Sequence, residues 1–318
     1  MNTKTKKNLV IIAGPTASGK TAVGIEIAKK LKGEIISADS MQIYKYMDIG
    51  SAKPTKEEMQ GIPHHMIDVI FPQEEFSVAV FRKMAAGYIN EITENNKLPI
   101  LVGGTGLYIN SLTRNLDFTE ISFDLDYRNE LTKIAENNGN EYLHKMLEVV
   151  DPESYQRLFP NDVKRVIRAL EVFKHTGKTI TEYQKESKAR PIEYNLAYIG
   201  LNMDRQTLYN RINMRVDKMF DMGILDEVTR LKGMGYQRDM VSMQGIGYKE
   251  IFDYFDGLCT LEEVKDKIKQ FSRNYAKRQL TWFKRDERVN WVNIDEYSSF
   301  EEITENIIAY IEGKFKFL

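Results

Sequence analysis

A loop near the start of the chain reads Gly14-Pro15-Thr16-Ala17-Ser18-Gly19-Lys20-Thr21. It fits the pattern G-x-x-x-x-G-K-[ST] of a phosphate-binding loop. Glycines let the backbone curl so that successive N–H groups converge on phosphate oxygens, and the following helix adds the positive end of its dipole. We expect Lys20 to reach the terminal phosphate and the Thr21 hydroxyl to ligate Mg²⁺.

Outward from this loop, apolar strands alternate with helical patterns. A helix is predicted over Lys20–Lys32, with Gly33 as its C-cap, and a second over Phe76–Asn95, with Ser77 as a possible N-cap. The predicted strands are Leu9–Ala13, Glu34–Asp39 and Leu98–Val102. Such alternation is typical of a parallel sheet covered by helices on both faces.

The pattern becomes helical between residues 116 and 195, with no convincing buried strand, and strands return at Leu196–Met203. Asp204 can cap a helix that runs to Met222, and a further long helix begins beyond Leu261. A strand at Arg288–Ile294 and a closing helix follow. We therefore predict an α/β fold, in which 1–115 and 196–318 form a P-loop NTPase-like parallel sheet core and 116–195 is an inserted all-helical module.

Composition limits the class of protein. The 318 residues are 42% hydrophobic, which is typical of a globular chain. The single cysteine, Cys259, excludes an intramolecular disulfide framework and any Cys-rich zinc module, and suits a reducing compartment. No apolar run approaches the length of a membrane span, so we expect no membrane and a cytoplasmic location. The pair His64-His65 lacks nearby Cys or His partners, which favours local hydrogen bonding or a role in a substrate pocket over metal ligation.

Several polar residues are predicted at the carboxyl ends of the strands, where ligands bind in an open α/β sheet. Asp39 ends the second strand and can hold Mg²⁺ through water, act as a base, or cap a turn. The turn Gly103-Gly104-Thr105-Gly106 ends the third strand and opens another helix. Arg211 and Arg215 lie four residues apart on one helix face. They either belong to a solvated surface or stabilise a departing phosphate group.

Taken together, these segments resemble the tRNA dimethylallyltransferase family, also called tRNA isopentenyltransferases. The resemblance is spread over nearly the whole chain, in family order. The matching stretches are Gly14–Thr21, Asp39-Ser40-Met41-Gln42 with Tyr44, Met47–Gly50 through Lys53-Pro54, His64–Asp68, Gly103–Tyr108, Asn161-Asp162 with Arg165–Val172, Gln244–Glu250 and Ala276–Arg285. The chain departs from the family pattern at three positions: Phe159 replaces a frequent His, Ser51 a usual Thr, and Gly245 a usual Ala.

The resemblance implies transfer of a dimethylallyl group from dimethylallyl diphosphate to the exocyclic amine of the tRNA adenosine 3′-adjacent to the anticodon. The loop Gly14–Thr21 would hold the diphosphate, with Mg²⁺ on Thr21. Asp39 would take a proton from the amine, and Thr105 would hydrogen-bond near the same nitrogen or the reacting phosphate. The remaining catalytic residues that the resemblance implies are Lys20, Arg211 and Arg215.

The resemblance also implies the anticodon stem-loop as partner, with the target adenine flipped out of the loop. The implied tRNA-binding residues are Asp39, Ser40, Met41, Gln42, Thr105, Arg128, Lys164, Arg165, Val166, Ile167 and Arg168. In the late helix the spacing of Lys269, Arg273, Lys277 and Lys284 predicts a basic stripe for RNA or solvent. A second stripe, predicted to pack on the core, comprises Val264, Ile268, Phe271, Tyr275 and Trp282. We expect a monomer.

Two other classes stay open on the residues alone. A kinase that binds ATP would use the same cradle for phosphoryl transfer, but leaves the basic residues of the insertion unexplained. A regulatory module that binds nucleotide would not need Asp39, Thr105 and the arginines to converge. A preference for dimethylallyl diphosphate over ATP in a thermal-shift experiment separates these classes from the prenyltransferase.

Overall fold

The structure is a computed structural model that describes residues 6–114, 124–189 and 191–316. Contacts between its α-carbons separate two units. Unit 1 comprises Met1–Ile109 and Glu193–Leu318, and unit 2 comprises Asn110–Ile192. Among the described residues no helix combines the length and the apolar character that crossing a bilayer requires.

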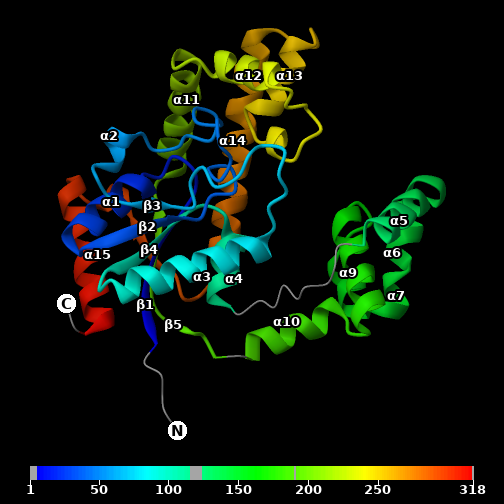
Figure 1. Ribbon diagram of the computed structural model, residues 1–318, viewed down its shortest axis with the longest axis horizontal. Helices are drawn as coiled ribbons and strands as arrows, with labels where there is room; N and C mark the ends of the chain where they lie inside the picture. The colour runs from blue at the N-terminus through cyan, green and yellow to red at the C-terminus, as the bar shows by residue number, and fades with distance from the viewer. Residues whose placement is uncertain (1–5, 115–123, 190, 317–318) are drawn as a thin grey trace. The chain divides into compact units, whose positions relative to one another are not determined.

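Unit 1 is built on a parallel sheet of six strands, in the order β3-β2-β4-β1-β5-β6 (Figure 1). The predicted parallel sheet is confirmed, and in its centre Ile12 of β1 lies opposite Val102 of β4 and Ile199 of β5. The strands are β1 (Lys7–Ala13), β2 (Gly33–Ser37), β3 (His64–His65), β4 (Leu98–Gly103), β5 (Tyr194–Asn202) and β6 (Asn290–Asn293). Every residue of β2 and β4 is buried, as expected for strands covered on both faces.

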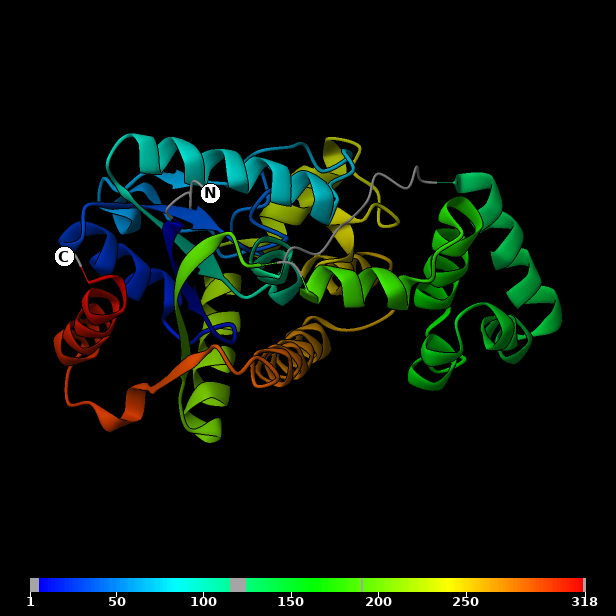
Figure 2. The ribbon, with the colours of Figure 1, turned by 90° about the horizontal axis from the view of Figure 1, so that it is seen from below.

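Helices cover both faces of this sheet. On one face, α1 (Lys20–Lys30) and α15 (Phe300–Phe315) lie side by side and share an apolar core with the strands (Figure 1). Helix α3 (Val78–Glu94) packs on β2 and β4 through Phe81, Ala85, Ile89 and Ile92 (Figure 2). The predicted cap of α3 is confirmed, because the Ser77 hydroxyl accepts from the N–H of Val80 at 3.2 Å.

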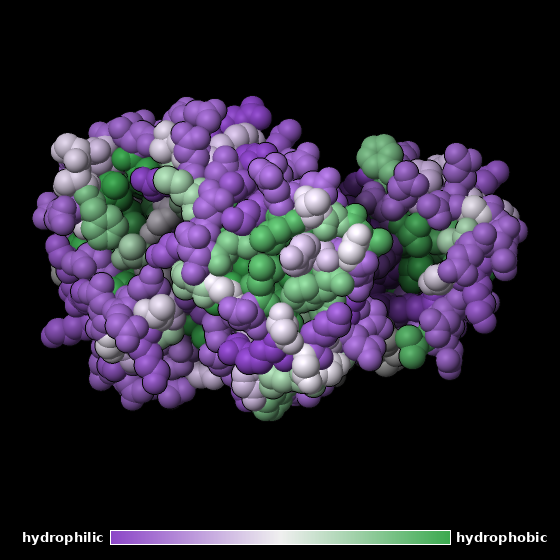
Figure 3. All heavy atoms as spheres, turned by 90° about the horizontal axis from the view of Figure 1, so that it is seen from above, coloured by the Kyte–Doolittle hydropathy of each residue, from purple (hydrophilic) through white to green (hydrophobic). Residues whose placement is uncertain are grey.

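Four helices form a second apolar core within unit 1. They are α11 (Arg205–Asp221), α12 (Ile224–Gly233), α13 (Tyr248–Phe255) and α14 (Leu261–Phe283). The Asp204 cap of α11 is confirmed by a 2.9 Å bond from the N–H of Thr207, whereas α12 and α13 were not predicted. Apolar side chains gather on the face in Figure 3, where α12 and α13 lie. The exposed ones in this part of the chain are Met222, Met234, Val241 and Leu258.

The prediction that Gly33 caps the first helix is wrong. Helix α1 ends at Lys30, and Lys32 takes the left-handed conformation at φ 50°. Gly33 is the first residue of β2, where a Cβ atom would lie 2.7 Å from Ile100 Cδ1 and 2.8 Å from the carbonyl oxygen of Leu98. This glycine therefore permits close strand packing, which sequence position alone does not distinguish from capping.

Unit 2 consists of helices in its described part. Helix α4 (Gly106–Thr113) begins in unit 1 and ends in unit 2. The others are α5 (Leu125–Asn138), α6 (Asn140–Lys145), α7 (Leu147–Val150), α8 (Pro152–Arg157), α9 (Val163–Thr176) and α10 (Ile180–Ala189). Its own core is formed by α5, α6, α7 and α9, with Leu131, Leu143 and Val166 fully buried. A unit with its own core suits an inserted module.

Candidate active site

The phosphate-binding loop joins β1 to α1, as the motif predicts. Gly14 has φ 153°, and a Cβ atom there would lie 2.7 Å from the carbonyl oxygen of Leu201. Gly19 has φ 87° and directly precedes α1, so its glycine character is required by backbone geometry. The backbone of the loop and the amino end of α1 thus lie together, which is the arrangement that binds a phosphate chain.

Two cations and one carboxylate meet at this loop. Lys20 Nζ donates to the carbonyl oxygen of Pro15 at 2.6 Å, and Arg215 donates to the Thr16 hydroxyl at 3.3 Å. Burial and the neighbouring charge of Arg215 lower the pKa of Lys20 to about 7, although Asp39 opposes the shift. Burial likewise lowers the pKa of Arg215, against the opposing charge of Asp39. The excess of cations favours an anionic ligand.

Asp39 and Thr105 come together at the carboxyl ends of β2 and β4. The N–H of Thr105 donates to the carbonyl oxygen of Ala38 at 3.0 Å, and its hydroxyl accepts from the N–H of Ser40 at 3.1 Å. Asp39 Oδ1 accepts from the N–H of Met41 at 2.9 Å. Among the residues that the structure describes, this is the only hydrogen bond to that carboxylate, so capping a turn leaves its second oxygen able to accept a proton.

Two tyrosines near Asp39 were not predicted as site residues. Burial and then the negative charge of Asp39 raise the pKa of Tyr275 on α14. The pKa of Tyr108 on α4 is raised by burial, by Tyr44 and by Asp39, and its ring stacks on Phe81 with centroids 4.0 Å apart. Both phenols stay protonated, so each can donate a hydrogen bond beside the carboxylate.

Gln279 on α14 links the two halves of the site. Its Oε1 accepts from the N–H of Thr16 at 2.8 Å, and its Nε2 donates to the carbonyl oxygen of Gly104 at 2.9 Å. The side chain is buried in the stripe that includes Ala276 and Phe283. The sequence gives one indication of this role: Gln279 lies on the apolar stripe of its helix, where a buried polar side chain points to a specific hydrogen-bonding function.

The other predicted residues of unit 1 differ in their environment. Arg211 is exposed and makes no hydrogen bond or ion pair with another described residue, in contrast to Arg215. The amide of Gln42 accepts from Ser37 Oγ at 2.8 Å and donates to the carbonyl oxygen of Ala52 at 3.2 Å, so it links β2 to the chain that follows Asp39. Ser18 is buried, and its hydroxyl has no hydrogen-bond partner among the described residues.

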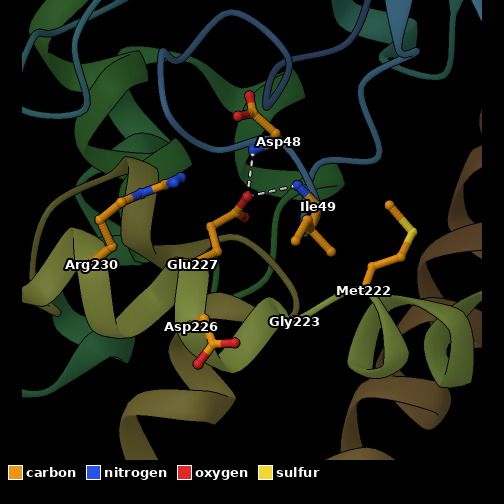
Figure 4. A pocket seen from close by; sticks show the side chains of 7 residues that line it. All are labelled: Asp48, Ile49, Met222, Gly223, Asp226, Glu227 and Arg230. Atoms are coloured by element: carbon orange, nitrogen blue, oxygen red, sulfur yellow. Dashed lines mark hydrogen bonds between the residues drawn. The ribbon is translucent and has the colours of Figure 1, made fainter. Parts of the chain in front are cut away.

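The chain after Asp39 is held by Glu227 of α12 (Figure 4). This buried carboxylate accepts from the N–H groups of Asp48, Ile49 and Gly50 at 2.9, 2.8 and 3.1 Å. It also accepts from the Tyr248 hydroxyl at 2.8 Å. A cavity of about 370 Å³ opens beside it, but none of the lining residues belongs to the phosphate-binding loop or is Asp39 or Thr105. We therefore interpret Glu227 as a support for the loop.

In unit 2, the predicted RNA-binding residues fall into two groups. Lys164 and Arg165 are exposed at the start of α9, whereas the side chains of Val166 and Ile167 are buried in the core of the unit. Those two side chains therefore pack in the core of the unit. Arg128 Nε and Arg168 Nη1 donate to the buried carboxylate of Glu171 at 2.8 and 2.5 Å.

In the late helix α14, three residues of the two predicted stripes differ from the prediction in their environment. Lys269 forms an ion pair with Asp217 at 2.7 Å, and Arg273 donates to Asn213 Oδ1 at 2.7 Å, so both are bound to α11. Lys277 and Lys284 are exposed as predicted. The prediction that Trp282 packs on the core is wrong, because its side chain is 41% exposed while Phe283 is buried.

The described residues contain no group of three or more His, Cys, Asp or Glu side chains placed to hold a metal ion. His64 Nδ1 bonds the carbonyl oxygen of Ile62 at 2.8 Å, and His65 Nε2 bonds Glu34 at 2.7 Å. The local hydrogen bonding predicted for this pair is therefore confirmed.

Comparison with known proteins gives one family. The model of the family described as IPP transferase matches residues 42–286. A tRNA dimethylallyltransferase of Caldanaerobacter subterraneus subsp. tengcongensis is 51% identical over 311 residues, which cover 97% of this chain and 99% of that protein. One from Acetivibrio thermocellus is 52% identical over 304 residues, which cover 96% and 97% of the two chains.

Solved structures with the same fold include enzymes of this kind. The full-length tRNA isopentenylpyrophosphate transferase from Bacillus halodurans has a TM-score of 0.74 and 47% identity, over 98% of this chain and 97% of that one. A eukaryotic dimethylallyltransferase, captured in crystallographic snapshots acting on tRNA, has a TM-score of 0.79 and 28% identity. That match covers 95% of this chain and 78% of the eukaryotic chain.

Proposed function

Because this chain belongs to the IPP transferase family and is a prenyltransferase that modifies tRNA, we propose that its Gly14–Thr21 loop binds the diphosphate of dimethylallyl diphosphate. The reaction joins the dimethylallyl group to the exocyclic amine of the adenosine 3′-adjacent to the anticodon and releases diphosphate. The observation that carries the proposal is the meeting of Lys20, Arg215 and Asp39 at one loop.

The positive charge at the loop is suited to stabilising diphosphate as the leaving group. Lys20 and Arg215 are cations whose charged forms are disfavoured by burial in the free protein. An anionic ligand supplies the missing counter-charge, and its charge grows as the bond to carbon breaks. We propose that both cations stabilise the departing diphosphate more strongly than the bound donor, which lowers the barrier. Arg211, one helical turn away and exposed, would meet the donor at the surface of the site.

Mg²⁺ fits the chemistry of this loop. Thr21 is exposed at the first turn of α1 and offers a hydroxyl oxygen, the hard type of ligand that this cation prefers. Bound there with diphosphate oxygens, Mg²⁺ would neutralise charge on the leaving group. The proposal requires no further metal ligand from the described residues, in accord with their lack of a clustered metal site.

Asp39 is proposed as the general base. The adenine amine is a weak nucleophile because its lone pair is delocalised into the ring. Its nitrogen gains a bond to carbon and must lose a proton, so a base that takes this proton as the C–N bond forms assists the attack. That proton passes to the carboxylate of Asp39 while the carbon–oxygen bond to diphosphate breaks. A positioned base contributes roughly 10²–10⁴-fold. Thr105, bonded to Ser40 beside Asp39, is placed to hold the amine or the reacting phosphate.

We propose that unit 2 grips the anticodon stem-loop. The exposed Lys164 and Arg165 are suited to phosphate contacts, which position RNA without reading its bases. Ser40 and Met41 lie next to Asp39, where a flipped adenine must enter. Action as a monomer in the cytoplasm is part of the same proposal. A single species with the 36.9 kDa mass of one chain in analytical ultracentrifugation, which binds one RNA, is the expected result for a monomer.

The experiment that tests the function measures transfer of labelled dimethylallyl from its diphosphate to an anticodon stem-loop RNA. Wild type should label the RNA, whereas Asp39→Ala and Asp39→Asn should lose at least about a hundredfold in rate with RNA binding retained. A stem-loop carrying guanosine at the target position is the control and should stay unlabelled. Equal rates for wild type and Asp39→Asn would exclude Asp39 as the base, and turnover of ATP without transfer would favour a kinase.

A further inference from the structure

We propose that Gln279 is a positioning residue that sets the spacing between the donor loop and the turn that carries Thr105. The inference rests on the proposed function of these two segments. Gln279 belongs to α14, which is remote in sequence from both: the hydrogen bonds to Thr16 and Gly104 span 263 and 175 residues. One planar amide therefore joins the loop that holds the diphosphate to the turn beside the proposed base.

The geometry fixes the orientation of this amide. Its Oε1 accepts from the N–H of Thr16 at 2.8 Å and its Nε2 donates to the carbonyl oxygen of Gly104 at 2.9 Å. Exchanging oxygen and nitrogen would set a donor against a donor and an acceptor against an acceptor. The side chain is 5% exposed, so water cannot readily replace either bond. A buried amide held at both ends is a rigid link between its two partners.

The turn Gly103–Gly106 packs closely against side chains of α14. A Cβ atom on Gly104 would lie 2.1 Å from Gln279 Nε2, and one on Gly106 would lie 2.2 Å from Trp282 Cδ1. Both glycines that flank Thr105 therefore lie in close contact with side chains of the same helix. On its other side Thr105 is bonded to Ser40. The position of Thr105 between α14 and the Asp39 segment is thus determined from two directions.

Spacing matters because the two substrates are held by different segments. The diphosphate lies on the loop that includes Thr16, and the adenine amine approaches Asp39 and Thr105. In a displacement at carbon, the nucleophile, the carbon and the leaving oxygen must be aligned, and an error of about 1 Å can cost roughly a hundredfold in rate. Losing Gln279 should therefore lower kcat more than it raises KM for dimethylallyl diphosphate, since neither binding segment loses its own ligand contacts.

The test compares Gln279→Glu with Gln279→Met in the transfer reaction across pH. A protonated glutamate keeps the carbonyl oxygen that accepts from Thr16 and gains an O–H that can donate to Gly104. The ionised form has no donor, so the bond to Gly104 is lost. We expect kcat of Gln279→Glu to fall roughly ten- to a hundredfold below wild type at high pH and to recover toward it as pH falls through the pKa of the new carboxyl, which burial raises.

Gln279→Met has similar length and no hydrogen bond, so its loss in kcat should not vary with pH relative to wild type. Gln270, exposed on the same helix, supplies the matched control: Gln270→Glu should follow wild type at every pH. A pH-independent ratio of Gln279→Glu to wild type, or an unchanged kcat in Gln279→Met, would overturn the role of Gln279 while leaving the proposed function intact. Absence of transfer by wild type would overturn the proposed function itself.

Discussion

Two groups of charges, one half-buried and one around a fully buried carboxylate, differ in how they are balanced. At the phosphate-binding loop, Lys20 and Arg215 share the carboxylate Asp39, and Glu58 is a further negative charge acting on Arg215, yet burial still lowers the pKa of both cations. In unit 2, Glu171 is fully buried and receives hydrogen bonds from Arg128 and Arg168. Burial would raise the pKa of Glu171, but the bonds from the two arginines and from the N–H of Asp124 lower it.

The difference separates a ligand site from a structural network. Around Glu171 the charged form is the favoured one, because its partners are supplied by the same unit. At the loop the charged form of Lys20 is disfavoured until a counter-charge arrives. The free protein is therefore less stable at this site, and the site gains affinity for an anion. Replacing a charge should therefore affect activity at the loop and stability in unit 2.

The largest effect is expected for Lys20→Met. Removing a cation that faces the leaving group should reduce the transfer rate by about 10²–10³-fold. The free energy of unfolding should stay unchanged or rise, because a buried charge without a full partner has been removed. Transfer assays and urea denaturation of the same samples check both statements. A strongly destabilised Lys20→Met would show that the lysine holds the loop together in the absence of ligand.

The next effect in size is the loss of stability in Glu171→Gln. An amide cannot balance two guanidinium groups, so we expect a loss of about 3 kcal/mol in the free energy of unfolding, less if water reaches the half-exposed arginines. Glu153→Gln is the control, because its ion pair with Lys185 is exposed and should contribute at most about 1 kcal/mol. Equal losses in the two variants would contradict the structural role of Glu171.

The sequence predicted the loop better than it predicted the contacts around it. Lys20 and Thr21 belong to a continuous motif, so their position follows from local geometry alone. Gln279 and Glu227 bind segments more than 170 residues away, and no periodic pattern encodes such a pairing. In the same way, β3 has two residues, too few for an alternation of apolar and polar side chains. Val166 and Ile167, which are buried in unit 2, were grouped with RNA contacts by the resemblance alone.

A smaller effect should appear in the pH dependence of diphosphate binding. Since the pKa of Lys20 is about 7 in the free protein, the lysine must take up a proton when the anion binds at higher pH. The affinity should therefore fall as pH rises above about 7, by at most about tenfold per pH unit. Calorimetry in buffers of different ionisation enthalpy measures the proton uptake directly. Lys20→Met is the control that corrects for the titration of diphosphate itself, and identical uptake in both proteins would exclude Lys20 as the source.

The smallest effect concerns the acid stability of unit 2. The pKa of Glu171 is lower in the folded protein than its usual value, so its contribution is fully present at neutral pH and is lost as pH falls through the folded-state pKa. The stability difference between wild type and Glu171→Gln should therefore shrink as pH falls below the usual titration range of a glutamate. Urea denaturation at several pH values measures this convergence. A difference that instead widened toward acid would mean that Glu171 binds a proton more readily in the folded protein, and the contrast with the phosphate-binding loop would be lost.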